Sequence, residues 1–250
     1  RPSAAVTAKR LFGPRGRGFR EDEIRQSVDA EAMLSTRGLS VGYDHALVSD
    51  IDLDVFPSDI IGIIGASGIG KTTILRTLAG LIPPFKGSLE HTLVESGELG
   101  YIPQRLGLVR HASVEHNVTL GARATARKPP AGTSNRQWKE TVTREAINAM
   151  GLTEKTREPV RRLSGGQQRR TATARTLAQR PRIILADEFL SELDAENVEM
   201  VFGAIHRLVK EDGSALVVVE HNVERAFRYC TRVLRVRDGR LHPVQGGESE

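Results

Sequence analysis

The chain has 250 residues, of which 39% are hydrophobic, 27% are charged and only one, Cys230, is a cysteine. This length is enough for one large domain with a substantial core, and a single cysteine excludes both a disulfide framework and a cysteine-rich zinc site. The net charge of +5 does not indicate nucleic-acid binding, because six cations and no acid lie in residues 1–20 and the rest of the chain carries a net charge of −1.

The ends of the chain are expected to flank a central domain. Residues 1–32 are basic and contain several glycines, so we interpret them as a flexible extension, and residues 242–250 as a C-terminal tail. The apolar residues 4–6 are too few for a secretory signal, whose apolar region spans about 7–15 residues. No run approaches the roughly 18 apolar residues of a membrane-spanning helix, so any role at a membrane would depend on a partner.

The first part of the central domain reads as strand, loop and helix. Apolar residues alternate with polar ones through residues 37–56, which predicts a pair of antiparallel strands at the edge of a sheet. Residues 59–64 are almost continuously apolar, as in a strand covered on both faces of a parallel sheet. A glycine-rich loop follows, and residues 72–81 predict a helix.

The later part alternates between helices and strands after a helical insertion. Residues 105–162 are predicted to form a mainly helical lobe, inserted between core segments 33–104 and 163–241. The elements expected after it are a helix at 167–179 before Pro181, a strand at 183–186, an amphipathic helix at 198–209, a strand at 215–219 and a hairpin at 233–241. This alternation implies an open α/β sheet, whose ligands bind at the carboxyl ends of the strands.

Residues 65–72 match the phosphate-binding pattern G-x-x-x-x-G-K-[ST] in full. Backbone N–H groups of such a loop wrap around phosphate oxygens, and the N-terminus of the next helix adds positive potential. Lys71 is expected to reach the β- and γ-phosphates and Thr72 to ligate Mg²⁺. A chance match is the alternative, and the strand before and the helix after the loop disfavour it. The residues expected to contact the nucleotide here are Gly65, Ala66, Ser67, Gly68, Ile69, Gly70, Lys71, Thr72 and Thr73.

Two adjacent carboxylates follow the predicted strand at 183–186. At the carboxyl end of a neighbouring strand, Asp187 can hold Mg²⁺ and Glu188 can act as general base on an attacking water. A buried strand ending in two acids is weak evidence alone. Together with the phosphate-binding loop it becomes strong.

Two more polar residues follow predicted strands. His221 comes shortly after the strand at 215–219, and Gln104 comes after the apolar segment 99–103. A structural histidine and an ordinary loop amide are the alternatives for these two side chains. The end of its strand favours a role at the phosphates for His221, whereas Gln104 stays ambiguous from the residues alone.

Residues 163–168, Leu-Ser-Gly-Gly-Gln-Gln, place two glycines at the start of a helix. They could form a second anion site with the Ser164 hydroxyl, or an ordinary helix cap. Spacing leaves open whether Ser164 serves a nucleotide of its own chain or one of a partner.

Taken together, these motifs resemble those of the ATP-binding-cassette (ABC) ATPases over roughly residues 33–241. Residues 65–72 resemble the Walker A loop, residues 183–188 the Walker B strand and residues 163–168 the signature sequence. The resemblance implies a P-loop NTPase fold with a mixed parallel core sheet, an N-terminal antiparallel β edge and an inserted helical subdomain.

The same resemblance implies further roles for single residues. Gln104 is the Q-loop glutamine and a Mg²⁺ ligand, Asp194 is the D-loop aspartate and His221 is the switch histidine. Tyr43 stands where the family stacks an aromatic ring on adenine, with a core aromatic as the alternative. The implied catalytic residues are Glu188, His221, Gln104 and Lys71.

The family also implies a dimer whose two protomers share two ATP molecules. Each ATP would be faced by one protomer's phosphate-binding loop and by the other's signature residues, which are Ser164, Gly165, Gly166 and Gln167. Some residues depart from the family pattern: Phe189 replaces a common proline, and Glu192 and Glu220 are unusual at their positions.

A nucleotide-binding domain without a membrane-spanning segment is similar to the separate ATPase subunits of prokaryotic importers, and residues 108–118 resemble the phosphonate and phosphate-type branch. The implied partners are a second identical or paralogous ATPase subunit, a membrane permease and a solute-binding protein, on the cytoplasmic face of the membrane. No nucleic acid is expected. The alternatives are a soluble ABC ATPase acting on a macromolecular assembly, and a small-molecule kinase, which would leave residues 163–168 and His221 without a role.

Overall fold

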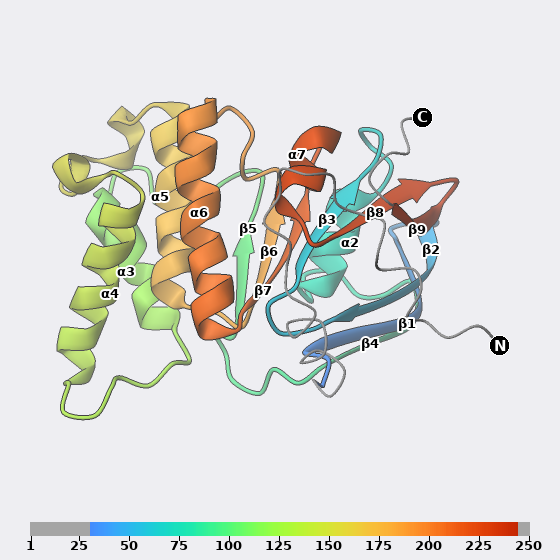
Figure 1. Ribbon diagram of the computed structural model, residues 1–250, viewed down its shortest axis with the longest axis horizontal. Coiled ribbons are helices and arrows are strands. Elements are labelled where there is room, and N and C mark those ends of the chain that lie inside the picture. The colour runs from blue at the N-terminus through green and yellow to red at the C-terminus, as the bar shows by residue number, and fades with distance from the viewer. Residues whose placement is uncertain (1–30, 245–250) are drawn as a thin grey trace, which may run out of the picture. The chain divides into compact units, whose positions relative to one another are not determined.

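The computed structural model describes residues 31–244, which form two β-sheets covered by helices (Figure 1). Of the predicted extension at 1–32 and the predicted tail at 242–250, only residues 31–32 and 242–244 fall within this range.

The larger sheet carries six strands in the order β5-β6-β7-β3-β8-β9. The first five strands in this order are parallel to their neighbours, and β9 pairs antiparallel with β8 in the predicted C-terminal hairpin. The strands are β3 (Ile60–Ile64), β5 (Leu99–Ile102), β6 (Ile183–Asp187), β7 (Ala215–Val219), β8 (Arg232–Arg237) and β9 (Arg240–Val244). The predicted α/β fold with a mixed core sheet is therefore confirmed.

The smaller sheet is antiparallel and has the order β2-β1-β4, with β1 (Leu34–Gly42), β2 (Ala46–Val55) and β4 (Lys86–His91). The predicted hairpin is present as β1 and β2, but it belongs to a sheet of its own and is not an edge of the core sheet. The sequence does not predict β4, because its side chains are almost all exposed and show no apolar alternation.

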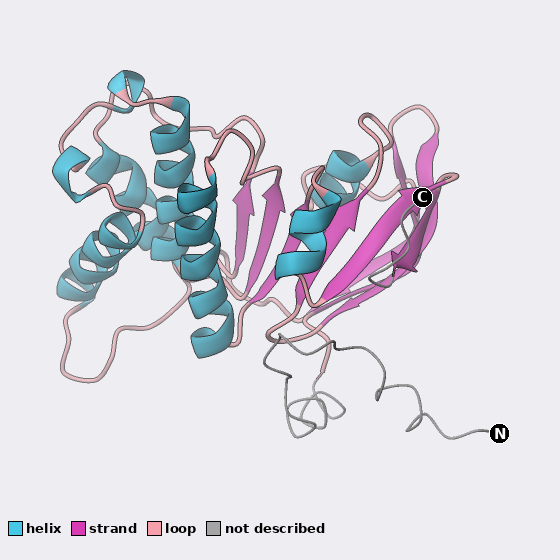
Figure 2. Cartoon of the chain, turned by 45° about the horizontal axis from the view of Figure 1, so that its top comes forward, coloured by secondary structure: helices cyan, strands magenta, loops and turns pink. Residues whose placement is uncertain are grey.

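Helices α3 (Val114–Ala124) and α4 (Asn135–Ala149) lie within the predicted insertion, and α5 (Gly165–Gln179) and α6 (Ala195–Asp212) stand beside them (Figures 1 and 2). Two short 3₁₀ helices, η2 (Thr153–Lys155) and η3 (Val160–Arg162), connect α4 to α5. The last helix within residues 31–244 is α7 (Val223–Tyr229).

Helix α2 (Lys71–Leu78) directly follows the phosphate-binding loop. It ends three residues before the predicted boundary, because Gly80 adopts a φ of 68° and turns the chain. Helix α2 contacts strands of both sheets, which fixes the loop at its N-terminus.

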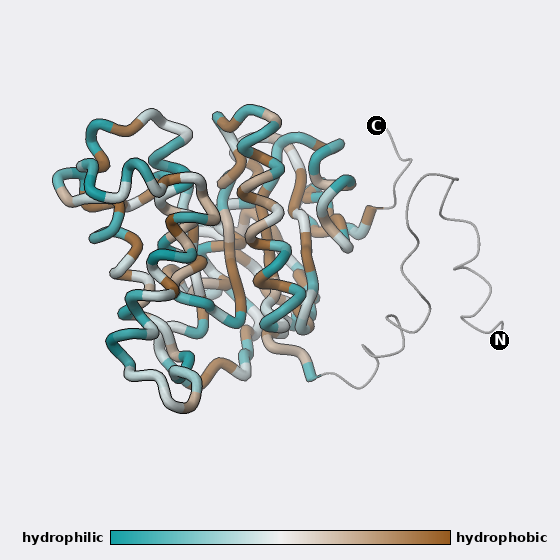
Figure 3. Tube along the Cα trace, turned by 60° about the vertical axis from the view of Figure 1, so that its left-hand side comes forward, coloured by the Kyte–Doolittle hydropathy of each residue, from teal (hydrophilic) through white to brown (hydrophobic). Residues whose placement is uncertain are grey.

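The core strands separate two hydrophobic clusters, since alternate side chains point to opposite faces. Ile184, Ala186, Leu216 and Val218 pack with the helices of the lobe, whereas Ile183, Leu185, Val217 and Val219 pack with α2 and the smaller sheet. Apolar residues accordingly concentrate along the core strands (Figure 3). Among the described residues, no helix combines the length and the apolar character that crossing a bilayer requires.

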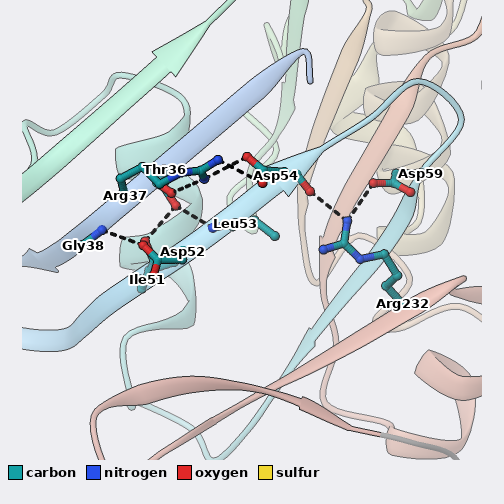
Figure 4. A network of polar contacts seen from close by, with 9 residues as sticks. All are labelled: Thr36, Arg37, Gly38, Ile51, Asp52, Leu53, Asp54, Asp59 and Arg232. Atoms are coloured by element: carbon teal, nitrogen blue, oxygen red, sulfur yellow. Dashed lines mark hydrogen bonds and ion pairs between the residues drawn. The ribbon is translucent and has the colours of Figure 1, made fainter. Parts of the chain in front are cut away.

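A polar network ties the two sheets together (Figure 4). Arg232 of β8 donates to the backbone oxygen of Asp54 in β2 at 2.8 Å and to the Asp59 carboxylate at 2.9 Å. Within the smaller sheet, the Thr36 hydroxyl donates to the Ile51 oxygen at 2.9 Å and accepts from the Leu53 N–H at 3.0 Å, where the register of β1 and β2 shifts.

Candidate active site

The phosphate-binding loop connects the carboxyl end of β3 to the N-terminus of α2. Gly70 is the N-cap of α2 and has a φ of 111°. A Cβ atom at this position would lie 3.0 Å from Val48 Cγ2 and 3.2 Å from Leu47 Cβ. Both the backbone conformation and the close approach of β2 therefore require glycine at the last loop position.

The Lys71 ammonium is folded back onto this loop. Its Nζ donates to the backbone oxygens of Gly65 at 2.9 Å and Ala66 at 2.8 Å, and the residue is only 4% exposed. Burial lowers the pKa of Lys71, while Glu188 and Asp187 act in the opposite direction. The Lys71 ammonium, whose hydrogen-bond partners are two neutral backbone oxygens, is thus held where phosphate oxygens would enter.

The Asp187 carboxylate ends β6 and is 1% exposed. Its Oδ1 accepts from the Thr72 hydroxyl at 3.2 Å. Burial raises the pKa of Asp187, and the neighbouring Glu188 adds to this effect. Thr72, Arg76 and Lys71 lower this pKa, but burial outweighs them, so the ionised carboxylate is only partly compensated.

These oxygens fit a magnesium ion. Mg²⁺ prefers hard oxygen donors and is usually bound by one or two side chains together with substrate phosphates and water. The described residues contain no cluster of three or more histidine, cysteine or acidic side chains that could bind a metal by themselves. Thr72 and Asp187 suit an ion that arrives with a nucleotide.

Replacing Asp187 with asparagine should raise the melting temperature of the nucleotide-free protein by a few degrees, because the buried charge disappears while Thr72 keeps an acceptor. Only the ionised carboxylate is penalised in the folded protein. The gain should therefore vanish below the ordinary pKa of aspartate and be largest above the raised pKa of Asp187. Thermal unfolding of both proteins from acidic to neutral pH measures this difference, and an unchanged or lower melting temperature at neutral pH would contradict it.

The Glu188 carboxylate lies between two side chains from other strand ends. Its Oε2 accepts from Gln104 Nε2 at 3.0 Å, and its Oε1 lies 2.5 Å from His221 Nε2. Glu188 itself has a φ of 52°, a left-handed conformation that is uncommon for a residue with a side chain. Strained backbone of this kind is typical of functional sites.

The phosphate-binding loop, Gln104, Glu188 and His221 line a pocket of about 230 Å³. Its lining residues come from four separate stretches of the sequence, and they are Ser67, Gly68, Gly70, Lys71, Thr72, Thr73, Gln104, Glu188 and His221. The pocket thus brings together most of the residues expected at the phosphates, including Gln104, which is ambiguous in the sequence. The expected residues that do not line it are Gly65, Ala66, Ile69 and Asp187.

Tyr43 lies outside this pocket and is 56% exposed. Its hydroxyl accepts from Arg76 Nη1 on α2 at 3.3 Å. Such exposure excludes the alternative that Tyr43 is a core aromatic, and its ring is available to a flat ligand.

The signature residues also lie outside the pocket, at the N-terminus of α5. The Ser164 hydroxyl accepts from the Gln167 N–H, and the Gln167 side chain accepts from the Ser164 N–H, which forms a capping box. Asp194 similarly caps α6 by accepting from the backbone and side chain of Asn197. Within this chain, the helix-cap interpretation describes their contacts, and roles at a partner's nucleotide stay predictions.

Two polar residues near the pocket escape the sequence motifs. Arg169 is buried on α5, and its Nη1 donates to the Glu188 backbone oxygen at 3.1 Å. Glu220 is buried beside His221, where burial raises its pKa. The sequence of α5 gives no signal for Arg169, because Arg170 and Arg175 are charged residues of the same helix.

Comparison with known proteins agrees with the motifs. A family model described as ABC transporter matches residues 48–191. The Phosphonates import ATP-binding protein PhnC 2 of Pseudomonas savastanoi pv. phaseolicola is 36% identical over 230 residues, covering 84% of this chain and 82% of that protein. The Lipoprotein-releasing system ATP-binding protein LolD 2 of Caulobacter vibrioides is 34% identical over 230 residues, covering 85% of this chain and 97% of that protein.

Solved structures share the fold. The dimeric bacterial ABC transporter cassette MJ0796 superimposes with a TM-score of 0.71 at 25% identity, covering 86% of this chain and 100% of that one. A dimeric post-hydrolysis state of MJ0796 bound to ADP and Pi gives a TM-score of 0.73 at 24% identity over the same share of this chain.

Proposed function

The chain belongs to the ABC transporter family as an ATP-binding subunit, and from this premise we propose which of its residues hydrolyse ATP and what it energises. The observation that carries the proposal is the position of the Glu188 carboxylate, which contacts both Gln104 and His221 in the pocket that also contains Lys71. A small-molecule kinase would leave residues 163–168 and His221 without a role.

The proposed hydrolysis begins with the phosphates in the loop at 65–72, where the backbone N–H groups and Lys71 bind the β- and γ-oxygens. A bound Mg²⁺, held by Thr72, Asp187 and Gln104, would neutralise charge on these oxygens. Glu188 accepts a proton from the water whose oxygen attacks the γ-phosphorus. As that bond forms, the bond to the β-phosphate oxygen breaks, which yields ADP and phosphate.

His221 and Gln104 orient this base from two sides. His221 Nε2 and Gln104 Nε2 each contact one oxygen of Glu188, so both carboxylate oxygens are held before a nucleotide arrives. The histidine also faces the space that a γ-phosphate would occupy, because it lines the same pocket as Lys71. Tyr43, exposed beside α2, is proposed to stack on the adenine ring.

The protein acts as a dimer with a membrane permease. We propose that Ser164, Gly165, Gly166 and Gln167 complete the pocket of the partner protomer, with Asp194 at the same interface. ATP would then hold the closed dimer together, and hydrolysis would release it. Identifying the subunits that co-purify with this chain would show whether the second protomer is a copy of it or a paralogue.

The proposed cargo is a small solute of the phosphonate type, which a solute-binding protein delivers to the permease. This chain is proposed to lie at the cytoplasmic face of the membrane, bound to that permease. Relatives named for phosphonate import support this class, as does the sequence at 108–118. A soluble ABC ATPase acting on an assembly lacks such support, because the matching family model is described as ABC transporter and several relatives are named for phosphonate import.

Reconstitution tests the transport proposal. The chain, a permease that co-purifies with it and a solute-binding protein are placed in proteoliposomes, and phosphate release is measured with and without methylphosphonate. We expect the solute-loaded binding protein to stimulate ATP hydrolysis and solute to accumulate inside the vesicles. ATP hydrolysis with no response to phosphonate or phosphate would reject this solute class while leaving the ATPase assignment intact.

A further inference from the structure

A buried arginine of α5 contacts the turn that carries the proposed base. Arg169 is 5% exposed, and its Nη1 donates to the Glu188 backbone oxygen at 3.1 Å. Its Nη2 lies 3.4 Å from Oε2 of Glu192, at the far end of the same turn. The guanidinium therefore spans residues 188–192, which we call the 188–192 turn.

The 188–192 turn has an unusual backbone that needs support. Glu188 and Glu192 both adopt left-handed conformations, with φ of 52° and 63°. Only one backbone hydrogen bond closes the turn, from the Ser191 N–H to the Glu188 oxygen at 3.0 Å. Arg169 adds a second donor to the same oxygen, so the carbonyl of the proposed base is held from two directions.

Other contacts fix the turn from its remaining sides. Phe189 is fully buried in the hydrophobic cluster of the lobe. Arg225 of α7 donates to the Leu190 oxygen at 3.3 Å and lies 3.7 Å from the Glu220 carboxylate. The turn is therefore contacted by two arginines, Arg169 of α5 and Arg225 of α7, each of which lies beside a glutamate.

Arg169 is poorly satisfied as a purely structural residue. Its Nε is buried without a hydrogen-bond partner, and a buried charge is stabilising only when its partners are well placed. Its partner Glu192 reaches toward the signature helix, because a Cβ on Gly165 would lie 3.3 Å from Glu192 Oε2. The pair therefore links the N-terminal turn of α5 to the backbone of Glu188.

We propose that Arg169 is a positioning residue for Glu188, and that Glu192 holds the guanidinium in place for this task. By fixing the Glu188 carbonyl, Arg169 directs the side chain of Glu188 toward Gln104 and His221. This inference rests on the proposed role of Glu188 as general base.

Replacing Arg169 with methionine tests the inference. Methionine keeps most of the apolar volume but removes both donors, so kcat for ATP hydrolysis should fall by about tenfold or more while KM for ATP is unchanged, since misplacing a catalytic group by about 1 Å can cost about 100-fold. Arg169→Lys should restore part of the loss, because lysine can still donate to the Glu188 oxygen. Glu192→Gln should lower kcat less than Arg169→Met.

Arg180→Met is the matched control. Arg180 lies just past the other end of α5 and forms a bidentate pair with Asp212 at 2.7 and 2.9 Å, at the opposite end of β6 from the 188–192 turn. This variant also loses an arginine–carboxylate pair, so it should lower the melting temperature while leaving kcat unchanged. Equal losses of kcat in Arg169→Met and Arg180→Met would indicate a general effect of stability and overturn the inference.

A double-mutant cycle with Glu188→Gln separates this inference from the function that it rests on. If Arg169 acts through Glu188, adding Arg169→Met to Glu188→Gln should cause no further loss of turnover. Turnover retained by Glu188→Gln would reject the proposed base itself. A folded Arg169→Met with normal kcat, beside an inactive Glu188→Gln, would reject only the positioning role. Should Arg169→Met fail to fold, the Arg169→Lys and Glu192→Gln variants decide the same question, and normal kcat in both would overturn it.

Discussion

Replacing Glu188 with glutamine is expected to reduce ATP hydrolysis by about 100- to 10,000-fold, the contribution typical of a general base. Glutamine keeps the size of the side chain and can still contact Gln104, but it cannot accept a proton from water. ATP binding should persist, because Lys71 and the phosphate-binding loop are unchanged. Phosphate release measures the loss, and equilibrium binding of ATP measures the retained affinity.

The same variant should accumulate as a dimer when ATP and Mg²⁺ are present, since the closed state is no longer resolved by hydrolysis. Sedimentation velocity with and without ATP detects this change. Glu199→Gln is a suitable control, because Glu199 lies on α6, pairs with Arg228 and Tyr229, and does not line the pocket. Full turnover by Glu188→Gln would exclude Glu188 as the base.

Replacing Lys71 with alanine should weaken ATP binding by about 10- to 100-fold, because hydrogen bonds from a charged donor contribute about 1.5–3 kcal/mol and each 1.4 kcal/mol is tenfold in affinity. The variant also leaves the Gly65 and Ala66 oxygens without the donor that they now share. The loop should therefore lose part of its order as well as its charge. Isothermal titration with ATP and Mg²⁺ measures the affinity directly.

Lys86→Ala provides the comparison for Lys71→Ala. Lys86 is an exposed residue at the start of β4, so removing it changes the net charge equally without touching the pocket. Its affinity for ATP should match that of the unmodified protein. If Lys71→Ala bound ATP as tightly as Lys86→Ala, the loop at 65–72 would not be the phosphate site.

Local sequence patterns predicted the elements that build the site. The loop at 65–72 is recognisable because its glycines are needed locally, as the crowding around Gly70 illustrates. The buried strands β3, β6 and β7 are recognisable because their residues are almost all apolar, and Asp187, the polar exception, stands at the end of β6 in the site. Their carboxyl ends then bring Lys71, Glu188 and His221 together by topology.

Other features depend on contacts between distant segments, which single-sequence patterns do not carry. Strand β4 is exposed and is held by its pairing with β1, so its own residues give no alternation. Arg169 follows the signature glycines as one more charged residue of a helix, and only the packing of α5 against the 188–192 turn distinguishes it. The proposed fit of the signature residues to another protomer likewise does not follow from the contacts of one chain.

The unusual Phe189 has a physical explanation in the structure. Proline disfavours compact conformations in the residue before it and pushes that residue toward extended backbone. Glu188 instead has a φ of 52°, which a following phenylalanine permits. The phenyl ring is also fully buried, so it contributes apolar contacts that a proline ring would provide less extensively.

In the proposed dimer, the capping contacts of Ser164 and Asp194 affect how easily the two protomers separate. Each of these side chains already has acceptor contacts inside its own chain, through Gln167 and Asn197. In the proposed dimer, separation of the protomers would therefore leave neither of these two side chains without a partner, so the electrostatic cost of separation at these positions is small. This arrangement suits a subunit that, in the proposed cycle, dimerises and separates once for each round of ATP hydrolysis.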